Sequence, residues 1–238
     1  ETTWTASLGM ADRSARRPVT DITPFRVGSI SKTMISLAAL ILEERGVLSL
    51  DTVLHHIIPE VGIDNSWADT DPIRLVHVLE HTAGFDDIHL REYAASDPDI
   101  RLLDAIQFNT TSRTARWRPG THMSYSNIGP TIGAYAIEHA TGVPYEDFVE
   151  RELFDVIGMR DANFQYNVRV ALSYKANGIT SEPYMHILDR PAGSISATAS
   201  DMAALLAMFI RRGHVDNRPL ISESSISRME RPDTTLTS

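Results

Sequence analysis

The stretch that decides the fold is Phe25-Arg26-Val27-Gly28-Ser29-Ile30-Ser31-Lys32, followed at once by the apolar run Thr33-Met34-Ile35-Ser36-Leu37-Ala38-Ala39-Leu40-Ile41-Leu42. The run predicts a helix from about Ser29 to Arg45. It ends at Gly46, a residue type that readily takes the left-handed conformation common after a helix. Apolar residues occupy most of the circumference of this helix, so we expect it to lie buried at the centre of the fold.

Lys32 is one of only two lysines in a chain that has twenty arginines. Arginine stays protonated in proteins, whereas a lysine removed from water can release its proton and take part in proton transfer. Lys32 follows Ser29 by three residues, so the two side chains share one face of a helix, the arrangement of an activated serine nucleophile. A structural interpretation is equally open: Ser29 could be a helix N-cap and Lys32 a solvated residue of the first turn.

The composition fits one large globular domain or two small ones. The chain has 238 residues, of which 42% are hydrophobic and 22% charged. Its net charge of −9 argues against nucleic acid as a partner and against electrostatic binding to acidic membranes. The chain has no cysteine, which excludes disulfides and thiolate metal sites. Its longest apolar run is far shorter than the roughly 20 residues that span a bilayer, so we expect no membrane span.

The expected secondary structure is rich in helix. A polar turn at 12–17 predicts a strand pair over 3–10 and 18–27. Residues 163–190 follow neither a helical nor a strand period. The segment Thr198-Ala199-Ser200-Asp201 predicts a capping box that opens a helix to about Arg211. Other helices are predicted over 72–83, 99–108, 127–141, 145–157 and 222–230.

A second polar segment, Ser124-Tyr125-Ser126-Asn127, lies at the start of the helix predicted over 127–141. The Tyr-x-Asn spacing sends the side chains of Tyr125 and Asn127 in the same direction from an extended or turn segment. A phenol can act as a general base where nearby cations hold it partly ionised, and an amide can bind a substrate carbonyl or the lysine. The alternative for Tyr125 is a half-buried side chain that fixes a loop.

In these segments the chain resembles the serine β-lactamase and penicillin-binding protein superfamily, in particular its class C β-lactamase, D,D-peptidase and β-lactamase-like esterase branch. The similarity extends in order over almost the whole chain. The resemblance implies an α/β (α+β) fold of the β-lactamase type, with the helical region nearly whole and the antiparallel sheet incomplete. The segments that carry it are residues 25–32, 43–51, 78–85, 125–129, 156–161, 191–194 and 200–203.

The resemblance also implies a chemistry. Ser29 would attack an ester, an amide or a β-lactam to form an acyl-enzyme, while Lys32 and Tyr125 share the proton transfers. The backbone N–H of Ser29, at a helix N-terminus, would supply half of an oxyanion hole. Asn127 would contact the substrate amide or brace Lys32. No cofactor is implied, the expected partner is a small-molecule or peptide substrate, and the family favours a periplasmic or secreted location. The oligomeric state stays open.

One element of the family is missing from the chain. The family carries a Lys-Thr-Gly or His-x-Gly triplet on a strand after the second motif, and no such triplet follows Tyr125. The chain also begins Glu-Thr-Thr-Trp, with no initiator Met. We therefore expect a single domain over 1–238, truncated at both ends. It would lack an N-terminal helix and strand and the C-terminal strands, and it could be inactive alone.

Two other functions stay open from the sequence. The segment His77-Val78-Leu79-Glu80-His81 fits the His-x-x-Glu-His pattern of inverted zinc peptidases, and on a helix the i,i+4 spacing puts both imidazoles on one face. The other possibility is a non-catalytic relative that uses the fold for binding or assembly. We expect the adjacent acids Asp86 and Asp87 to be loop or helix-start residues.

Overall fold

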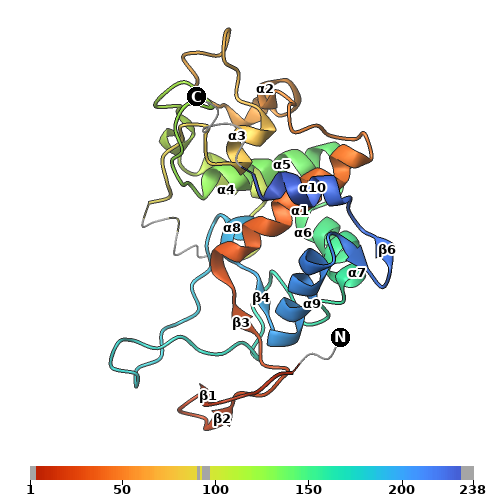
Figure 1. Cartoon of the computed structure of the whole chain (residues 1–238). Coiled ribbons are helices and arrows are strands. Elements are labelled where there is room, and N and C mark those ends of the chain that lie inside the picture. Colours follow the sequence, from red (N-terminus) through yellow and green to blue (C-terminus); the bar gives the residue numbers. More distant parts are fainter. Residues whose placement is uncertain (1–3, 90–91, 93–96, 232–238) are drawn as a thin grey trace.

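Two long helices form the centre of the molecule in the computed structural model, which describes residues 4–89, 92 and 97–231 (Figure 1). These helices, α1 (Ser31–Glu44) and α5 (Ile128–Thr141), pack against each other. Every residue of α1 from Leu37 to Leu42 is buried, as its apolar circumference requires. The prediction of a buried central helix is therefore confirmed, although its α-helical part begins at Ser31.

Shorter helices surround this pair. The helices α3 (Leu75–Leu79) and α4 (Leu102–Gln107) pack on α5, and α8 (Arg190–Gly193) packs on both α1 and α5. The remaining helical segments are η1 (Gly28–Ile30), α2 (Leu54–Ile57), η2 (Pro59–Val61), η4 (Thr111–Arg113), α6 (Tyr145–Val149), η5 (Glu150–Phe154), α7 (Asp155–Ile157), α9 (Ala199–Ile210) and α10 (Glu223–Met229).

Strands in the described part of the chain form three antiparallel pairs of two strands each. The pairs are β1 (Met10–Asp12) with β2 (Arg17–Pro18), β3 (Phe25–Arg26) with β4 (Ser196–Ala197), and β5 (His214–Val215) with β6 (Arg218–Pro219). The predicted hairpin is thus present only in its inner part, and residue 3 of the predicted strand lies outside the described residues. The rest of 18–27 differs from the prediction, because β3 pairs with β4 from the other end of the chain.

The β3–β4 pair positions the segment that leads into α1. Phe25 lies opposite Ala197 and Arg26 opposite Ser196. The pairing continues one residue further, where the N–H of Val27 donates to the carbonyl of Ile195 at 2.9 Å. Ser29 therefore follows directly from a strand that is held in register by residues about 170 positions away.

The helix predicted over 72–83 is shorter in the structure, because α3 ends at Leu79. His81 has a φ of 59°, and the N–H of Thr82 donates to the carbonyl of His77 at 2.8 Å. This is the hydrogen bond of a Schellman C-cap, with histidine at the position that glycine usually occupies. The chain therefore turns three residues before Gly84, the residue expected to end the helix.

The other helix predictions are close to the structure. The capping box before α9 is present: the N–H of Asp201 donates to Thr198 Oγ1, and the N–H of Thr198 donates to Asp201 Oδ2. The helix predicted over 99–108 is confined to α4. The helix predicted over 145–157 is divided into α6, η5 and α7, because its middle turn has the wider i→i+5 hydrogen bonds of a π-helix.

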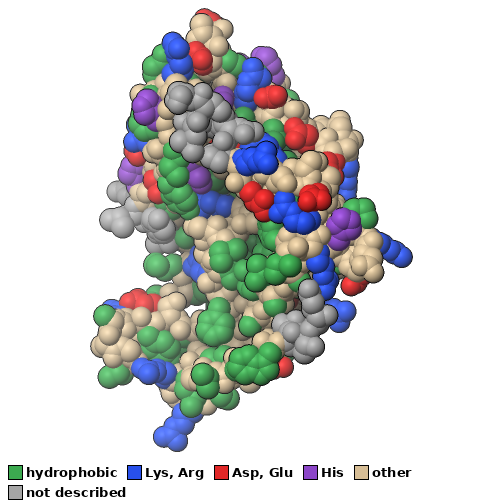
Figure 2. Space-filling model, in the orientation of Figure 1, with side chains coloured by type: hydrophobic (Ala, Val, Ile, Leu, Met, Phe, Trp, Pro, Cys, Tyr) green, Lys and Arg blue, Asp and Glu red, His purple; other side chains and the backbone are tan. Residues whose placement is uncertain are grey.

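Large hydrophobic side chains stay exposed around the N-terminal strands and on α9. Green hydrophobic groups are prominent in the lower half of Figure 2, where Figure 1 places β1 and β2. A two-stranded ribbon buries little apolar surface by itself. The exposed residues in or next to these elements include Leu8, Met10, Phe25, Leu206 and Ile210. None of the helices in the described ranges combines the length and hydropathy needed to cross a bilayer.

Candidate active site

Ser29 lies in the turn η1, immediately before α1. Its neighbour Ser31 is buried and fixes the turn: Ser31 Oγ donates to the carbonyl of Gly28 at 2.7 Å and accepts from the N–H of Ile195 at 3.3 Å. The residue at the N-cap of α1 is Ile30, and no side chain caps either η1 or α1. The interpretation of Ser29 as a helix cap is therefore wrong, and its hydroxyl is exposed.

The structure brings all four predicted site residues together. Ser29 Oγ lies 2.7 Å from the hydroxyl oxygen of Tyr125 and 3.1 Å from Nζ of Lys32. Lys32 Nζ also donates to Asn127 Oδ1 at 2.7 Å and to the carbonyl oxygen of Ala192 at 2.9 Å. Lys32 therefore has three oxygen acceptors, and the interpretation of this lysine as a solvated first-turn residue is wrong.

Tyr125 is 43% exposed, and its ring packs against two other groups of the site. The ring centroid lies 4.5 Å from that of His81, with the planes tilted by 30°, and 4.9 Å from Lys32 Nζ. An ammonium over an aromatic face is attracted by the negative face of the ring. Tyr125 is thus held between an imidazole and a cation, and its hydroxyl faces Ser29.

His81 holds the segment that carries Tyr125. Its carbonyl accepts from the N–H of Ser124 at 2.8 Å, and its Nδ1 accepts from the N–H of Ser126 at 3.3 Å. Burial, and after it the positive charge of Lys32, lowers the pKa of His81 to about 4, so the imidazole is neutral at physiological pH. The sequence indicated His81 as a possible zinc ligand and as part of a segment similar to the family, without a role in the serine site. Its contact with Tyr125, a residue 44 positions further along the chain, has no signal in the sequence.

A buried carboxyl group lies close to the same cluster. Asp189 is 2% exposed and precedes α8, the helix whose Ala192 carbonyl contacts Lys32. Its Oδ2 has no hydrogen-bond partner. Burial raises the pKa of Asp189 to about 7, which a hydrogen bond with Thr131 and the charge of Lys32 only partly offset. The carboxyl group of Asp189 therefore changes between its protonated and ionised forms around neutral pH.

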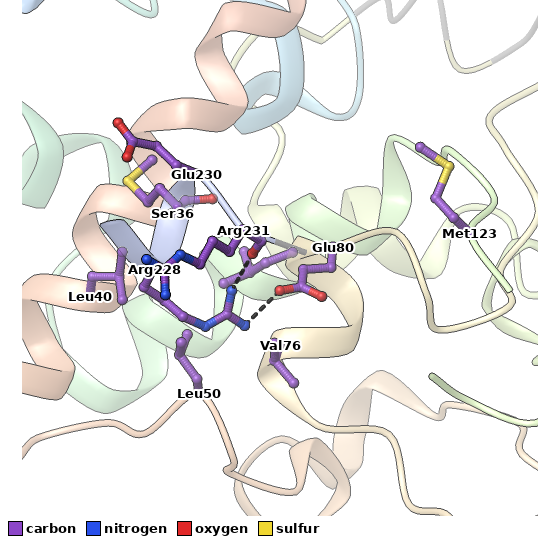
Figure 3. A pocket seen from close by; sticks show the side chains of 11 residues that line it. Ser36, Leu40, Leu50, Val76, Glu80, Met123, Arg228, Glu230 and Arg231 are labelled. Atoms are coloured by element: carbon purple, nitrogen blue, oxygen red, sulfur yellow. Dashed lines mark hydrogen bonds and ion pairs between the residues drawn. The ribbon is translucent and has the colours of Figure 1, made fainter. Parts of the chain in front are cut away.

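The geometry does not assemble the zinc site suggested by His77, Glu80 and His81. His77 Nδ1 accepts from the N–H of Arg74, and His81 lies beyond the end of α3 rather than on its face. Glu80 Oε1 accepts from Arg228 Nη2 at 2.6 Å, in a pocket beside α10 (Figure 3). Among the residues that the structure describes, no three His, Cys, Asp or Glu side chains are grouped to hold a metal ion.

That pocket is separate from the cluster around Ser29. Apolar side chains contribute much of its wall, and the Arg228–Glu80 ion pair crosses it in Figure 3. None of Ser29, Lys32, Tyr125 and Asn127 is among its lining residues. The candidate chemistry therefore belongs to the exposed site at the start of α1.

A serine at the start of a buried helix, with a lysine one turn later and a Tyr-x-Asn segment against both, defines the class of β-lactamase-like and penicillin-binding proteins. The comparisons agree with this class. The family model described as Beta-lactamase matches residues 1–237, and the chain belongs to this family.

Relatives of the chain have several names. Esterase EstB of Burkholderia gladioli is 30% identical over 182 residues, which cover 69% of this chain and 44% of EstB. A beta-lactamase of Yersinia enterocolitica is 25% identical over 206 residues, or 84% of this chain and 50% of the relative. The octameric penicillin-binding protein homologue from Pyrococcus abyssi superposes with a TM-score of 0.78 at 25% identity, over 94% of this chain and 52% of that one.

These matches confirm the predicted fold class, a β-lactamase-type α/β fold. In this chain most of the regular structure is helical. The chain spans about half the length of the curated relatives that it matches. The prediction that the domain is truncated at both ends stays a prediction.

Proposed function

We propose that this chain carries the nucleophile and the proton-transfer groups of a serine hydrolase. Its Ser29 would form an acyl-enzyme with an ester, an amide or a β-lactam. The single observation that carries the proposal is the contact of Ser29 Oγ with both the Tyr125 hydroxyl, at 2.7 Å, and Lys32 Nζ, at 3.1 Å. A hydroxyl is a weak nucleophile, and an adjacent group that accepts its proton is what activates it.

In the first step, Ser29 Oγ attacks the carbonyl carbon of the substrate while its proton passes either to the ionised oxygen of Tyr125 or to the nitrogen of a neutral Lys32. The carbonyl carbon then expels its leaving group, which takes up that proton, and the acyl group stays on Ser29. In the second step, water attacks the same carbon and gives a proton to the same base, which returns a proton to the serine oxygen as that oxygen leaves. Both groups lie within hydrogen-bond distance of Ser29 Oγ, as proton transfer requires.

The position of Ser29 favours negative charge on the reacting oxygens. The turn η1 runs directly into the 14-residue α1, whose N-terminal end carries a partial positive charge. The backbone N–H of Ser29 is the oxyanion donor in this proposal. Where Tyr125 is the base, Lys32 adds a nearby ammonium. One preorganised donor of this kind contributes about 10²–10³ in rate in other hydrolases.

The contacts support this function over the two alternatives. The zinc interpretation needs His77 and His81 on one helical face, and they are not on one face. A protein that used the fold only for binding would not need Ser29, Tyr125 and Asn127 all gathered around Lys32. The names of the relatives, an esterase and a beta-lactamase among them, suit a carbonyl substrate and leave its class open among ester, amide and β-lactam.

Covalent labelling tests the proposal. The protein is treated with a fluorophosphonate probe and separately with a fluorescent penicillin, and the labelled peptide is identified by mass spectrometry. We expect label on Ser29, its loss in Ser29→Ala, and wild-type labelling in Ser200→Ala, which removes another exposed serine. A folded wild-type protein that takes neither probe, or that takes label at another residue, would refute the proposal.

A further inference from the structure

Asp87 contacts Asn127 through the atoms of Asn127 that do not face Lys32. One carboxylate oxygen, Asp87 Oδ1, accepts from the backbone N–H of Asn127 at 2.9 Å and from its side-chain Nδ2 at 2.8 Å. The opposite end of the amide, Asn127 Oδ1, accepts from Lys32 Nζ at 2.7 Å. The asparagine is therefore clamped between a carboxylate and an ammonium.

The chemistry of these three groups allows only one orientation of the amide. An ionised carboxylate can only accept hydrogen bonds, and an ammonium can only donate them. The NH₂ of Asn127 must therefore face Asp87, and its carbonyl oxygen must face Lys32. A flipped amide would place a donor against the ammonium and an oxygen against the carboxylate. Asp87 removes this alternative, since its Oδ1 also binds the backbone N–H of the same residue.

Asp87 is itself held in place by its surroundings. Phe85, two residues before Asp87, is 1% exposed and belongs to the hydrophobic core. The guanidinium of Arg116 donates to the carbonyl oxygens of Gly84 and Phe85 at 3.1 Å and 2.6 Å. Asp87 Oδ1 accepts in addition from the N–H of Ile88 at 2.8 Å. The carboxylate is therefore set in position by its own loop.

We propose that Asp87 is a positioning residue of the site, which fixes the amide of Asn127 so that its carbonyl oxygen holds Lys32 Nζ next to Ser29 Oγ. Successive hydrogen bonds connect Asp87 to Asn127, Asn127 to Lys32, and Lys32 to Ser29. The kinetic part of this inference rests on the proposed function, because it is measured through the reactivity of Ser29. The contact itself is measured without any reaction.

The kinetic test compares rates of Ser29 labelling by the fluorophosphonate. Asp87→Ala is expected to slow labelling about tenfold or more, the scale of one hydrogen bond to a charged group. Asp87→Asn keeps an acceptor oxygen at the same place and should recover most of the rate. Asp99→Ala, at an exposed acid of another loop, loses the same charge and should label like the wild type. In an Asn127→Ala background, Asp87→Ala should have little further effect, because the residues act as one unit.

The second readout is the NMR signal of the Asn127 side-chain NH₂ in ¹⁵N-labelled protein, assigned by its absence in Asn127→Ala. The proton donated to the carboxylate should be shifted downfield. Asp87→Ala should abolish this shift, and Asp99→Ala should leave it unchanged. Thermal unfolding of each variant shows that it is folded.

The outcomes separate the two proposals. If Ser29 takes no label but the Asn127 signals depend on Asp87, the proposed function fails and the positioning contact stands. Wild-type labelling and wild-type Asn127 signals in Asp87→Ala would overturn the inference. Slower labelling of Asp87→Ala with unchanged Asn127 signals would also overturn it, as would an equal loss of labelling rate in Asp99→Ala.

Discussion

The ammonium nitrogen of Lys32 lies 2.9 Å from the carbonyl oxygen of Ala192, a residue 160 positions further along the chain. This contact ties the first turn of α1 to the short helix α8. Together with the contacts of Lys32 to Ser29 and Asn127, it places all three ammonium protons on oxygen acceptors. A lysine held in this way cannot swing into solvent without breaking each of these bonds.

Replacement of Lys32 is expected to abolish most of the reactivity of Ser29. Lys32→Met should lower the rate of fluorophosphonate labelling about 10²-fold or more, the usual contribution of a group that transfers protons. Lys32→Arg should not restore the rate, because a guanidinium stays protonated and is planar. The matched control is Lys175→Met, which removes the only other lysine, an exposed residue. Unimpaired labelling of folded Lys32→Met would show that this lysine has no part in activation.

Tyr125→Phe removes one hydroxyl and keeps the ring that packs on His81. The melting temperature should change little, since the ring contacts with His81 and Lys32 do not need the hydroxyl. The labelling rate should fall by about 10² or more if the phenol accepts the proton of Ser29. The control is Tyr166→Phe, which removes the hydroxyl of another exposed tyrosine and should label like the wild type. Equal labelling rates in Tyr125→Phe and wild type would assign the proton transfer to Lys32 alone.

Asp189 should make the protein less stable as the pH rises from about 4 to about 7. In the unfolded chain this carboxyl loses its proton near 3.8, whereas burial keeps it protonated in the folded state up to about 7. Between these values the folded state binds the extra proton, so the free energy of unfolding falls with increasing pH, by a few kcal/mol in all.

Asp189→Asn removes this titration. Its free energy of unfolding, measured by urea denaturation at pH 5 and pH 8, should decrease less over this interval than that of the wild type. The exposed Asp99→Asn should keep the wild-type dependence. Identical pH dependence in Asp189→Asn and wild type would mean that Asp189 is not protonated in the folded protein near neutrality.

His81 should have the opposite effect on the free energy of unfolding, which should fall as the pH decreases below about 6.5. Its pKa is about 4 in the folded state against 6.5 for an unperturbed histidine, so the unfolded chain takes up a proton first as the pH falls. The free energy of unfolding contributed by His81 is complete above about 6.5 and is lost progressively down to about 4. In His81→Asn, which tolerates the left-handed backbone, this loss between pH 6.5 and pH 4 should be absent. Urea denaturation across that interval checks it, and a loss as steep as in wild type would contradict it.

The sequence predicted the parts of the site that depend on local spacing. Ser29 and Lys32 lie side by side because they are three residues apart, across the turn η1 and the first turn of α1. Tyr125 and Asn127 point the same way from one short segment. Both relations follow from backbone geometry alone. The buried α1 was equally predictable, because its apolar residues leave no polar face.

The sequence did not predict the contacts that depend on tertiary packing. The Ala192 acceptor is a backbone carbonyl, which every residue has, so no residue type indicates it. Asp87 has a neighbouring acid and looks like an ordinary loop residue until Asn127 is placed against it. The helix predicted over 72–83 extends too far, because His81 takes a left-handed conformation that glycine usually adopts and α3 ends at Leu79.

The dispersed origin of the Lys32 acceptors has a practical consequence. Ser29, Asn127 and Ala192 belong to three segments that meet only when α1, the start of α5 and α8 are docked. A partly folded chain can form α1 and still present a serine without its neighbours. If Ser29 reacts as proposed, the fraction of molecules that take a covalent label reports how much of a preparation has reached native packing. An active-site titration would thus count correctly assembled molecules, which a measurement of helix content does not distinguish.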